Sequence, residues 1–314
     1  MHLTMKAFVW RGLAAGAAGG AVAALFLRIV TETQIGFALK FEDAAGIGAP
    51  PGEAAEFTRG VQHVGGMVAA VLFGAVLGLV LGVTSAALRH RIAGTNEFQR
   101  VAKVAAAAFV AVTLLPALKY PPNPPTVGNP DTIGTRTASY LSLMLASMLI
   151  VLAAWWLWER LTRQGIDGAA RVALGGGAFV LMVTAAFLIW PASPDRIEPP
   201  NNDAAAVLVI SDDAPAAVLD QMLATGRETG DESYRDPKDP KEALDLDGVD
   251  QGTDLRGTPV AVSTSKLVSN AYASLLWSFR MKSFAGVALL WAVMAVVLGF
   301  LLDKQAAAQA RPST

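Results

Sequence analysis

The chain has 314 residues, of which 53% are hydrophobic and only 16% are charged, with a formal net charge of −1. A soluble domain carries about 25% charged residues, so this composition excludes an ordinary soluble protein and indicates a membrane protein in a lipid bilayer. The absence of cysteine excludes disulfides, iron–sulfur clusters, thiolate zinc sites and cysteine nucleophiles. No nucleic-acid partner is expected.

Several apolar runs are long enough to cross a bilayer, which takes roughly 17–25 residues. Six such runs lie at about Ala7–Val30, Val64–Leu88, Val101–Leu118, Ala138–Trp158, Val172–Trp190 and Phe284–Leu302. The sequence therefore predicts an all-α integral membrane protein with about six transmembrane helices, five within residues 1–191 and one within residues 273–314. A cleaved signal peptide is an alternative for the first run, but its length and the terminal Arg28 favour a retained helix.

The glycines of the first two runs recur every fourth residue. This spacing puts them on one helix face, where the missing side chain lets two backbones approach closely. We therefore predict glycine-mediated helix packing at Gly12, Gly16, Gly20, Gly74, Gly78 and Gly82.

Positive residues cluster at alternate ends of the predicted helices. The connections after the second and fourth helices hold Arg89, Arg91, Arg100, Lys103, Arg160, Arg163 and Arg171. Because lysine and arginine near membrane spans stay in the cytoplasm, we expect both termini to be cytoplasmic. The segment 119–137 and the segment 192–272 then face the outside.

The segment 119–137 is stiff and polar although it joins two apolar runs. It reads KYPPNPPTVGNPDTIGTRT, and each X-Pro step disfavours helix, so we predict a rigid extended path. Asp131 can cap the following helix or contribute an oxygen ligand to a cation, and these two roles can coexist. The residues of this predicted structural motif are Lys119, Tyr120, Pro121, Asn123, Pro124, Pro125, Gly128, Pro130, Asp131, Thr132, Gly134 and Arg136.

The segment 192–272 carries sixteen acidic and seven basic residues. A short strand at Ala206–Ile210 and a helix at Ala214–Ala224 are expected in it. Because Glu228–Asp254 is poor in apolar residues, we predict an extracytoplasmic insertion that is partly disordered. The run DLDGVDQGTD does not match the register of a calcium-binding loop.

The run KYPPNPPTVGNPDTIGTRTASY resembles the hallmark of the CbtA family of bacterial cobalt transporter subunits. Three other stretches are similar to the same family: Arg11–Glu32, Phe41–Ala44 together with Arg59–Gln62, and Leu275–Trp291. Residues 198–265 resemble an insertion relative to the short connection that is usual in the family. The resemblance implies a multi-pass protein of the bacterial inner membrane that takes part in cobalt uptake. It also implies transported Co²⁺ without a tightly bound cofactor, and a small single-helix partner, CbtB, that supplies histidines.

Cobalt(II) accepts imidazole and carboxylate ligands. We therefore predict an outer metal site formed by His63, Asp131, Asn123 and Glu32, provided that the first, second and fourth helices are neighbours. Simpler interpretations stay open, because His63 is also suited to the membrane interface and Glu32 to pairing with Arg28. Arg136 is expected to pair with Asp131 or Glu32.

Two further classes of function stay open beside cobalt transport. No P-loop, H-E-x-x-H or G-x-S-x-G motif occurs, so an enzyme is not expected. A membrane scaffold would use the proline-rich segment to dock a partner, and a transporter of nickel or a corrinoid would keep the same architecture. A homo-oligomer is compatible with each of these.

Overall fold

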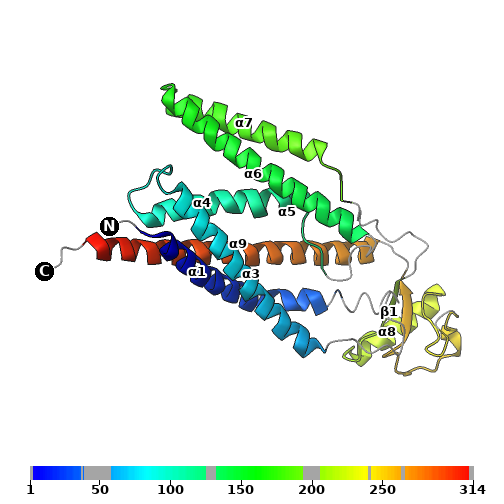
Figure 1. The fold of residues 1–314 in the computed structure, drawn as a ribbon. Helices are drawn as coiled ribbons and strands as arrows, with labels where there is room; N and C mark the ends of the chain where they lie inside the picture. Colours follow the sequence, from blue (N-terminus) through cyan, green and yellow to red (C-terminus); the bar gives the residue numbers. More distant parts are fainter. Residues whose placement is uncertain are drawn as a thin grey trace. The chain divides into compact units, whose positions relative to one another are not determined.

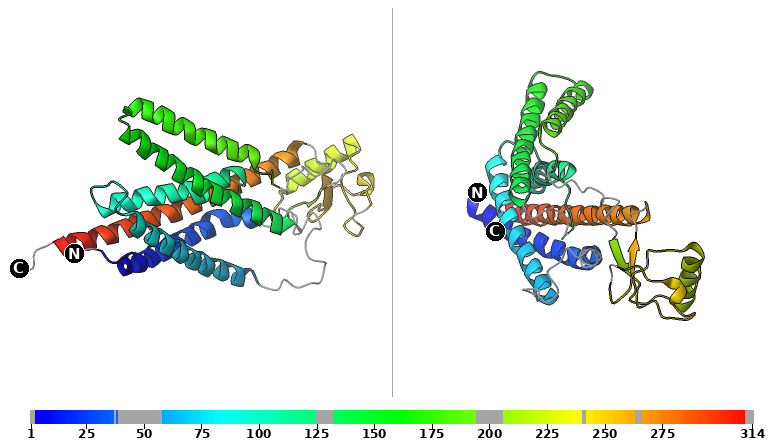
Figure 2. Two further views of the ribbon diagram at one scale, coloured as in Figure 1. Left: turned by 45° about the horizontal axis from the view of Figure 1, so that its top comes forward. Right: turned by 90° about the vertical axis from the view of Figure 1, so that its right-hand side faces the viewer.

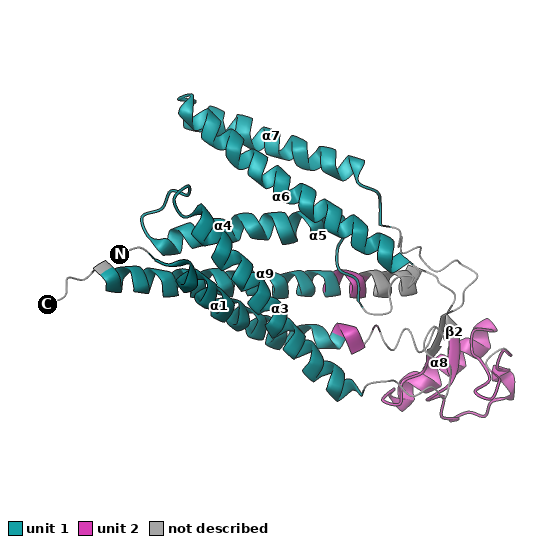
Figure 3. Ribbon diagram, viewed as in Figure 1, with its two compact units in different colours: residues 1–33, 55–196, 279–314 teal, residues 34–54, 197–278 magenta. Residues whose placement is uncertain are grey.

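The computed structural model describes residues 3–36, 38, 58–124, 132–193, 206–239, 242–262 and 266–310. The chain forms two compact units (Figure 3). Unit 1 comprises residues 1–33, 55–196 and 279–314, and unit 2 comprises residues 34–54 and 197–278. Residues 39–57 and 125–131 lie outside the described residues, so the expectations for Phe41–Ala44, Pro125, Gly128, Pro130 and Asp131 concern positions that the structure does not describe.

Long helices make up unit 1 (Figure 1). Six helical stretches of the described chain are long and apolar enough to cross a membrane, which confirms the six predicted spans. The elements are α1 (Met5–Phe26), η1 (Leu27–Thr31), α3 (Arg59–Leu88), α4 (Glu97–Phe109), η2 (Val110–Leu114), α5 (Leu115–Lys119), α6 (Ile133–Arg163), α7 (Gly168–Ile189) and, from residue 279 on, α9 (Lys266–Ala310).

The helices extend beyond the predicted apolar runs because polar residues continue and cap them. Asn96 precedes α4, and its side-chain oxygen accepts the Gln99 N–H at 2.9 Å. The last helix was predicted at Phe284–Leu302, but α9 has 45 residues. Arg280 and Lys282 interrupt the apolar pattern without ending the helix, which is why hydropathy alone placed its start too late.

Two spans contain a π-helical segment, in which one residue more than usual fills a turn. The segment η1 follows α1 directly, and η2 joins α4 to α5. Pro116 lies at the start of α5, where its missing N–H breaks the regular α-helical hydrogen bonding. Thr113 of η2 accepts a hydrogen bond at 2.9 Å from the indole N–H of Trp291 in α9.

Glycines let α1 and α3 lie against each other with almost no side-chain volume between them. A Cβ placed on Gly78 would lie 2.5 Å from the Cα of Gly16, and one on Gly74 would lie 2.8 Å from the Cα of Gly20. Neither position can hold even an alanine without moving a backbone. The described contact between the two helices thus includes all six glycines of the two predicted stripes: Gly12, Gly16, Gly20, Gly74, Gly78 and Gly82.

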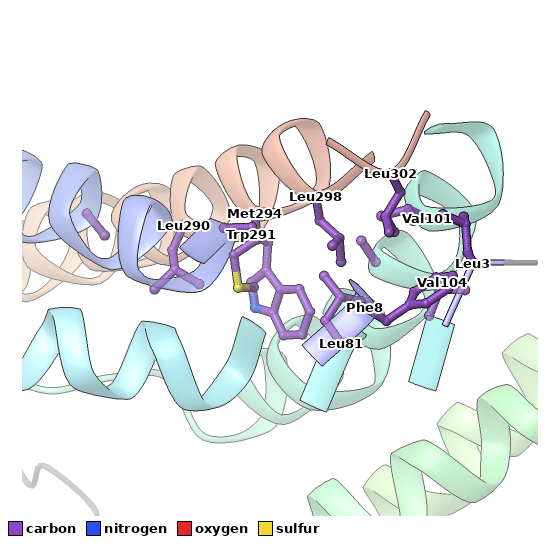
Figure 4. Close-up of a cluster of buried hydrophobic side chains, with 13 residues drawn as sticks. Leu3, Phe8, Leu81, Val101, Val104, Leu290, Trp291, Met294, Leu298 and Leu302 are labelled. Carbon is purple, nitrogen blue, oxygen red and sulfur yellow. The ribbon is translucent and has the colours of Figure 1, made fainter. Parts of the chain in front are cut away.

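A dry hydrophobic cluster joins the beginning of α1, the end of α3, α4 and the second half of α9 (Figure 4). Phe8 is 2% exposed, while Met294, Leu298 and Leu302 of α9 are fully buried. Val101 and Val104 complete the packing from α4. This end of unit 1 is therefore closed by interlocking apolar side chains from four helices.

The antiparallel pair α6 and α7 forms a hairpin that remains side by side in both views of Figure 2. Within unit 1, α6 contacts η2 and α5, and α7 accepts a hydrogen bond from Lys119 of α5. Most of the α7 surface is apolar and exposed, with Leu181 at 71% and Leu188 at 81% exposure. In a bilayer, these side chains are suited to contact lipid.

Unit 2 contains the only described departure from an all-α fold. Its strands β1 (Ala206–Val209) and β2 (Pro259–Val262) pair antiparallel, and α8 (Ala216–Thr229) lies between them in the chain. The strand expected at Ala206–Ile210 and the helix expected at Ala214–Ala224 correspond to β1 and α8, whereas β2 and its pairing were not predicted. Leu219 and Leu223 of α8 form a hydrophobic cluster with Tyr234, Leu246 and Leu255.

This packing differs from the disorder expected for Glu228–Asp254. The described part of that segment has turns, bridges and the short 3-10 helix η4 (Leu246–Gly248). The difference arises because a few apolar residues suffice when each is buried: Tyr234 is 5% exposed and Leu246 is 5% exposed. Burial, followed by the nearby charge of Asp231, raises the pKa of the Tyr234 hydroxyl.

Candidate functional site

The residues of greatest chemical interest lie where α1 and α3 meet at the end opposite the dry cluster. Glu32 directly follows η1, and Arg59 is the first residue of α3. Thr58 caps α3 by accepting the Val61 N–H on its hydroxyl, at 3.4 Å. Arg59 and His63 are four residues apart, so both side chains lie on one face of the first helical turns.

The glycine contact determines which residues face each other here. The two helices run antiparallel, so Gly12 lies by Gly82 and Gly20 lies by Gly74. When the same register is followed along α1, through the extra residue of η1, it brings Glu32 opposite the first turn of α3. The close packing of the glycine stripes therefore positions the polar group at the helix ends.

The side chains of Glu32, Arg59 and His63 form a compact polar cluster. The Oε1 atom of Glu32 lies 2.7 Å from Nε2 of His63 and accepts a hydrogen bond from Nη2 of Arg59 at 2.6 Å. The other terminal nitrogen of Arg59, Nη1, donates to Oε1 of Gln62 at 2.8 Å. Glu32 and His63 are each 24% exposed in their side chains, so the cluster is partly buried but open to solvent.

The helix end itself favours a carboxylate at this place. The first N–H groups of a helix lack intrahelical partners and carry a partial positive charge, which stabilises a nearby anion. Arg28 adds a longer-range attraction to Glu32. Among the described residues no ion pair joins Arg28 to Glu32, so the simple pairing of these two residues is not what holds the carboxylate.

Asn123 contacts α9 instead of Glu32 and His63. Its side-chain oxygen accepts a hydrogen bond at 2.8 Å from Nη2 of Arg280 in α9. The structure thus brings Glu32 and His63 together, connects Asn123 to α9, and does not describe Asp131. Within the described ranges, no group of three or more histidine, cysteine, aspartate or glutamate side chains is close enough to hold a metal ion.

The described beginning of the proline-rich segment is tied to the end of the α6–α7 hairpin. Lys119 donates from Nζ to the carbonyl of Phe187 at 2.7 Å, and the Tyr120 hydroxyl donates to the carbonyl of Pro191 at 2.7 Å. Trp190 reaches back to α6, where its indole N–H donates to Ser142 at 2.9 Å. Because Lys119 reaches the carboxyl end of α7, its positive charge also complements the negative end of the dipole of that helix.

Sequence reasoning did not predict the contacts of Arg59 with Glu32 and of Arg280 with Asn123. Arg59 stands one turn before His63, and that spacing was a usable signal for a shared contact with Glu32. Arg280 is 157 residues from Asn123 in the chain, and no local pattern links them.

The proline-rich segment, the six spans and the glycine stripes can be compared with known families. A family model described as "Probable cobalt transporter subunit (CbtA)" matches residues 5–229, which is more than half of the chain. The chain belongs to the CbtA family. No curated protein and no solved structure matches it.

The CbtA match includes Glu32, the start of α3 and the whole proline-rich segment. It extends through α8 into unit 2, so part of the region that resembled an insertion is included in it. The stretch Leu275–Trp291 lies beyond the match. As a CbtA protein the chain is a multi-pass membrane protein and a transporter subunit, and cobalt is the cargo that the family description names.

Proposed function

We propose that this CbtA protein is a membrane-embedded subunit for cobalt(II) uptake, and that Glu32 and His63 are the first protein ligands that the ion meets. The single observation that carries the proposal is the 2.7 Å contact between Glu32 Oε1 and His63 Nε2. These atoms come from two different spans and meet at a solvent-accessible helix end.

The spacing of Glu32 and His63 is already close to that of two ligands of one metal ion. At ligand distances of about 2.1 Å, adjacent ligands of one metal are about 3 Å apart. The observed separation of 2.7 Å is already near that value. Carboxylate and imidazole are both suitable ligands for a borderline cation such as Co²⁺.

Two protein ligands leave most of the coordination sphere open. Water would fill it at first, and a small single-helix partner of the CbtB type would then offer its histidines, as the resemblance to the family implies. Asp131 stays a candidate for a further ligand, as does Asn123 if it leaves Arg280. The open sphere suits an ion that must be released again, because a full set of protein ligands would hold it tightly.

The orientation belongs to the same proposal. The arginines of the α3–α4 and α6–α7 connections support a cytoplasmic position for those ends and for both termini. Glu32 and His63 would then face the outside of the inner membrane of a bacterium, where an uptake system first meets its cargo.

A scaffold without transport activity is the second candidate. It is favoured by the anchoring of Lys119, Tyr120 and Asn123, because these contacts make the described start of the proline-rich segment a fixed surface. A fixed surface is suited to docking a partner subunit. Nickel or a corrinoid would be an alternative cargo within the first candidate.

Uptake of radiolabelled cobalt at limiting metal tests the proposal, with and without a CbtB-type partner. We expect Glu32→Gln and His63→Ala each to lower uptake by at least about tenfold, since loss of even an indirect metal contact costs 10–100-fold in affinity. The exposed residues Glu159 and His90 provide matched controls, Glu159→Gln and His90→Ala, which should transport normally.

Each outcome decides between the candidates. Normal uptake by both site variants, at normal expression, would remove Glu32 and His63 from the pathway. A wild-type chain that moves no cobalt with any partner would favour the scaffold or another cargo.

A further inference from the structure

One atom of the candidate site makes two contacts. Glu32 Oε1 is 2.6 Å from Nη2 of Arg59 and 2.7 Å from Nε2 of His63. A metal ion held by Glu32 and His63 would need this oxygen and the space around it. The guanidinium of Arg59 already contacts this oxygen.

We propose that Arg59 is a tethered cation that occupies Glu32 until a divalent ion displaces it, and that returns when the ion leaves. This inference rests on the proposed function, because it assigns the displaced ion to the same site. Arg59 would thereby set the affinity of the site and the rate of release.

The guanidinium cannot vacate the carboxylate by losing its proton, since arginine stays charged in proteins. It has to move. Arg59 is the first residue of α3, and its side chain is 46% exposed, so no packed core holds it in place. A second partner, Gln62 Oε1 at 2.8 Å, lies on the same helix and can keep the guanidinium when it leaves Glu32.

Charge makes the two occupants exclude each other. A divalent cation and a guanidinium a few ångströms apart repel each other, and the repulsion is substantial at a partly buried site. The negative charge of Glu32 can compensate one of them at a time. Binding of the metal ion therefore carries the cost of moving Arg59, and the return of Arg59 assists release.

Arg28 provides a control that distinguishes this proposal from a general effect of positive charge near Glu32. Arg28 acts on Glu32 through space only, whereas Arg59 contacts the oxygen directly. Removing either arginine lowers the local positive charge by one unit. Only the removal of Arg59 takes away the direct contact of an arginine with Oε1, which then keeps its contact with His63.

The test measures Co²⁺ binding to the full-length chain in lipid nanodiscs by calorimetry, with Co²⁺ alone as the probe. We expect Arg59→Gln to lower the Kd by about three- to tenfold, which exceeds the effect of an exposed ion pair because the incoming ion is divalent. Arg28→Gln should change the Kd less than about twofold, and Arg59→Lys, which keeps the charge, should stay near wild type. Release into excess chelator should slow in Arg59→Gln by about the factor by which the Kd falls.

The sign of the change distinguishes the proposal from a structural role. If Arg59 merely held Glu32 in position, Arg59→Gln would weaken binding. A Kd that is unchanged or raised, while Glu32→Gln abolishes binding, would overturn the tethered-cation proposal and leave the cobalt site intact. Binding that does not depend on Glu32 in any variant would instead overturn the proposed function.

Discussion

Glu97 is a buried carboxylate among the described residues, with only 3% of its surface exposed. Its Oε1 accepts hydrogen bonds from Nε of Arg89 at 2.9 Å and from Nη1 of Arg100 at 2.7 Å. Its backbone N–H donates to Asp303 of α9 at 3.2 Å. One residue thus joins the ends of α3 and α9 to the start of α4, next to the dry cluster.

We expect Glu97→Gln to lower the free energy of unfolding by about 3 kcal/mol, because removing one partner of a buried ion pair leaves the other charges uncompensated. Arg89 and Arg100 would both lose their anion. Thermal unfolding of the purified chain in detergent measures the effect. Glu159→Gln, which makes the same chemical change at an exposed position, should leave the unfolding temperature as it is; equal stability of both variants would show that the network is dispensable.

At the scale of the helix, the glycine stripes connect packing to the candidate site. The Cβ of an alanine at position 78 would lie 2.5 Å from the Cα of Gly16 and 2.6 Å from its nitrogen. Since both atoms belong to backbone, only a separation of α1 and α3 can relieve the clash. That separation would also move Glu32 away from His63.

The expected result for Gly78→Ala is a loss of about 1–3 kcal/mol of stability from overpacking, together with weaker cobalt binding. Gly66 provides a control in the same helix, because a Cβ there meets nothing within 4 Å. Gly66→Ala should be neutral or slightly stabilising, as alanine favours helix over glycine. Calorimetric titration of both variants with Co²⁺ is the measurement, and normal binding by Gly78→Ala would contradict the link between packing and site.

The sequence predicts elements better than it predicts contacts. Apolar runs revealed the six spans, because the bilayer requires a minimum length of apolar helix. Spacing revealed the glycine stripes, although it could not tell which helix each stripe faces. The sequence was not recognised as predicting the π-helical segments, although Glu32 directly follows one of them, η1. Contacts such as Asn123 with Arg280 depend on the tertiary arrangement of distant segments, so they were missed.

At the largest scale, the contacts within unit 1 show which helix ends lie together at each of the two ends of the helix bundle. At one end Glu97 meets Asp303, and Phe8 joins the cluster that contains Leu302. At the other end Lys119 meets Phe187 and Arg280 meets Asn123. Successive spans therefore run in alternate directions, as a six-span chain with both termini on one side requires.

The orientation of these two ends can be tested because the chain has no cysteine of its own. Single cysteines are placed at exposed positions, Thr95→Cys and Gln164→Cys at one end and Ala192→Cys and Ser211→Cys in the segment after α7. We expect a membrane-impermeant maleimide to label Ala192→Cys and Ser211→Cys in intact cells. Thr95→Cys and Gln164→Cys should react only after permeabilisation, because arginines surround them.

This labelling also determines how Glu32 and His63 can act. In the expected orientation they would face the outside, where the partly exposed cluster would receive the ion, and the apolar cluster around Phe8 and Leu302 would close the cytoplasmic end. The ion would then have to open the closed end, at the cost of breaking its apolar packing and the contacts of Glu97. The reverse labelling pattern would put the same cluster at the cytoplasmic face, where an ion leaves an uptake system, and Glu32 and His63 would then act in release instead of capture.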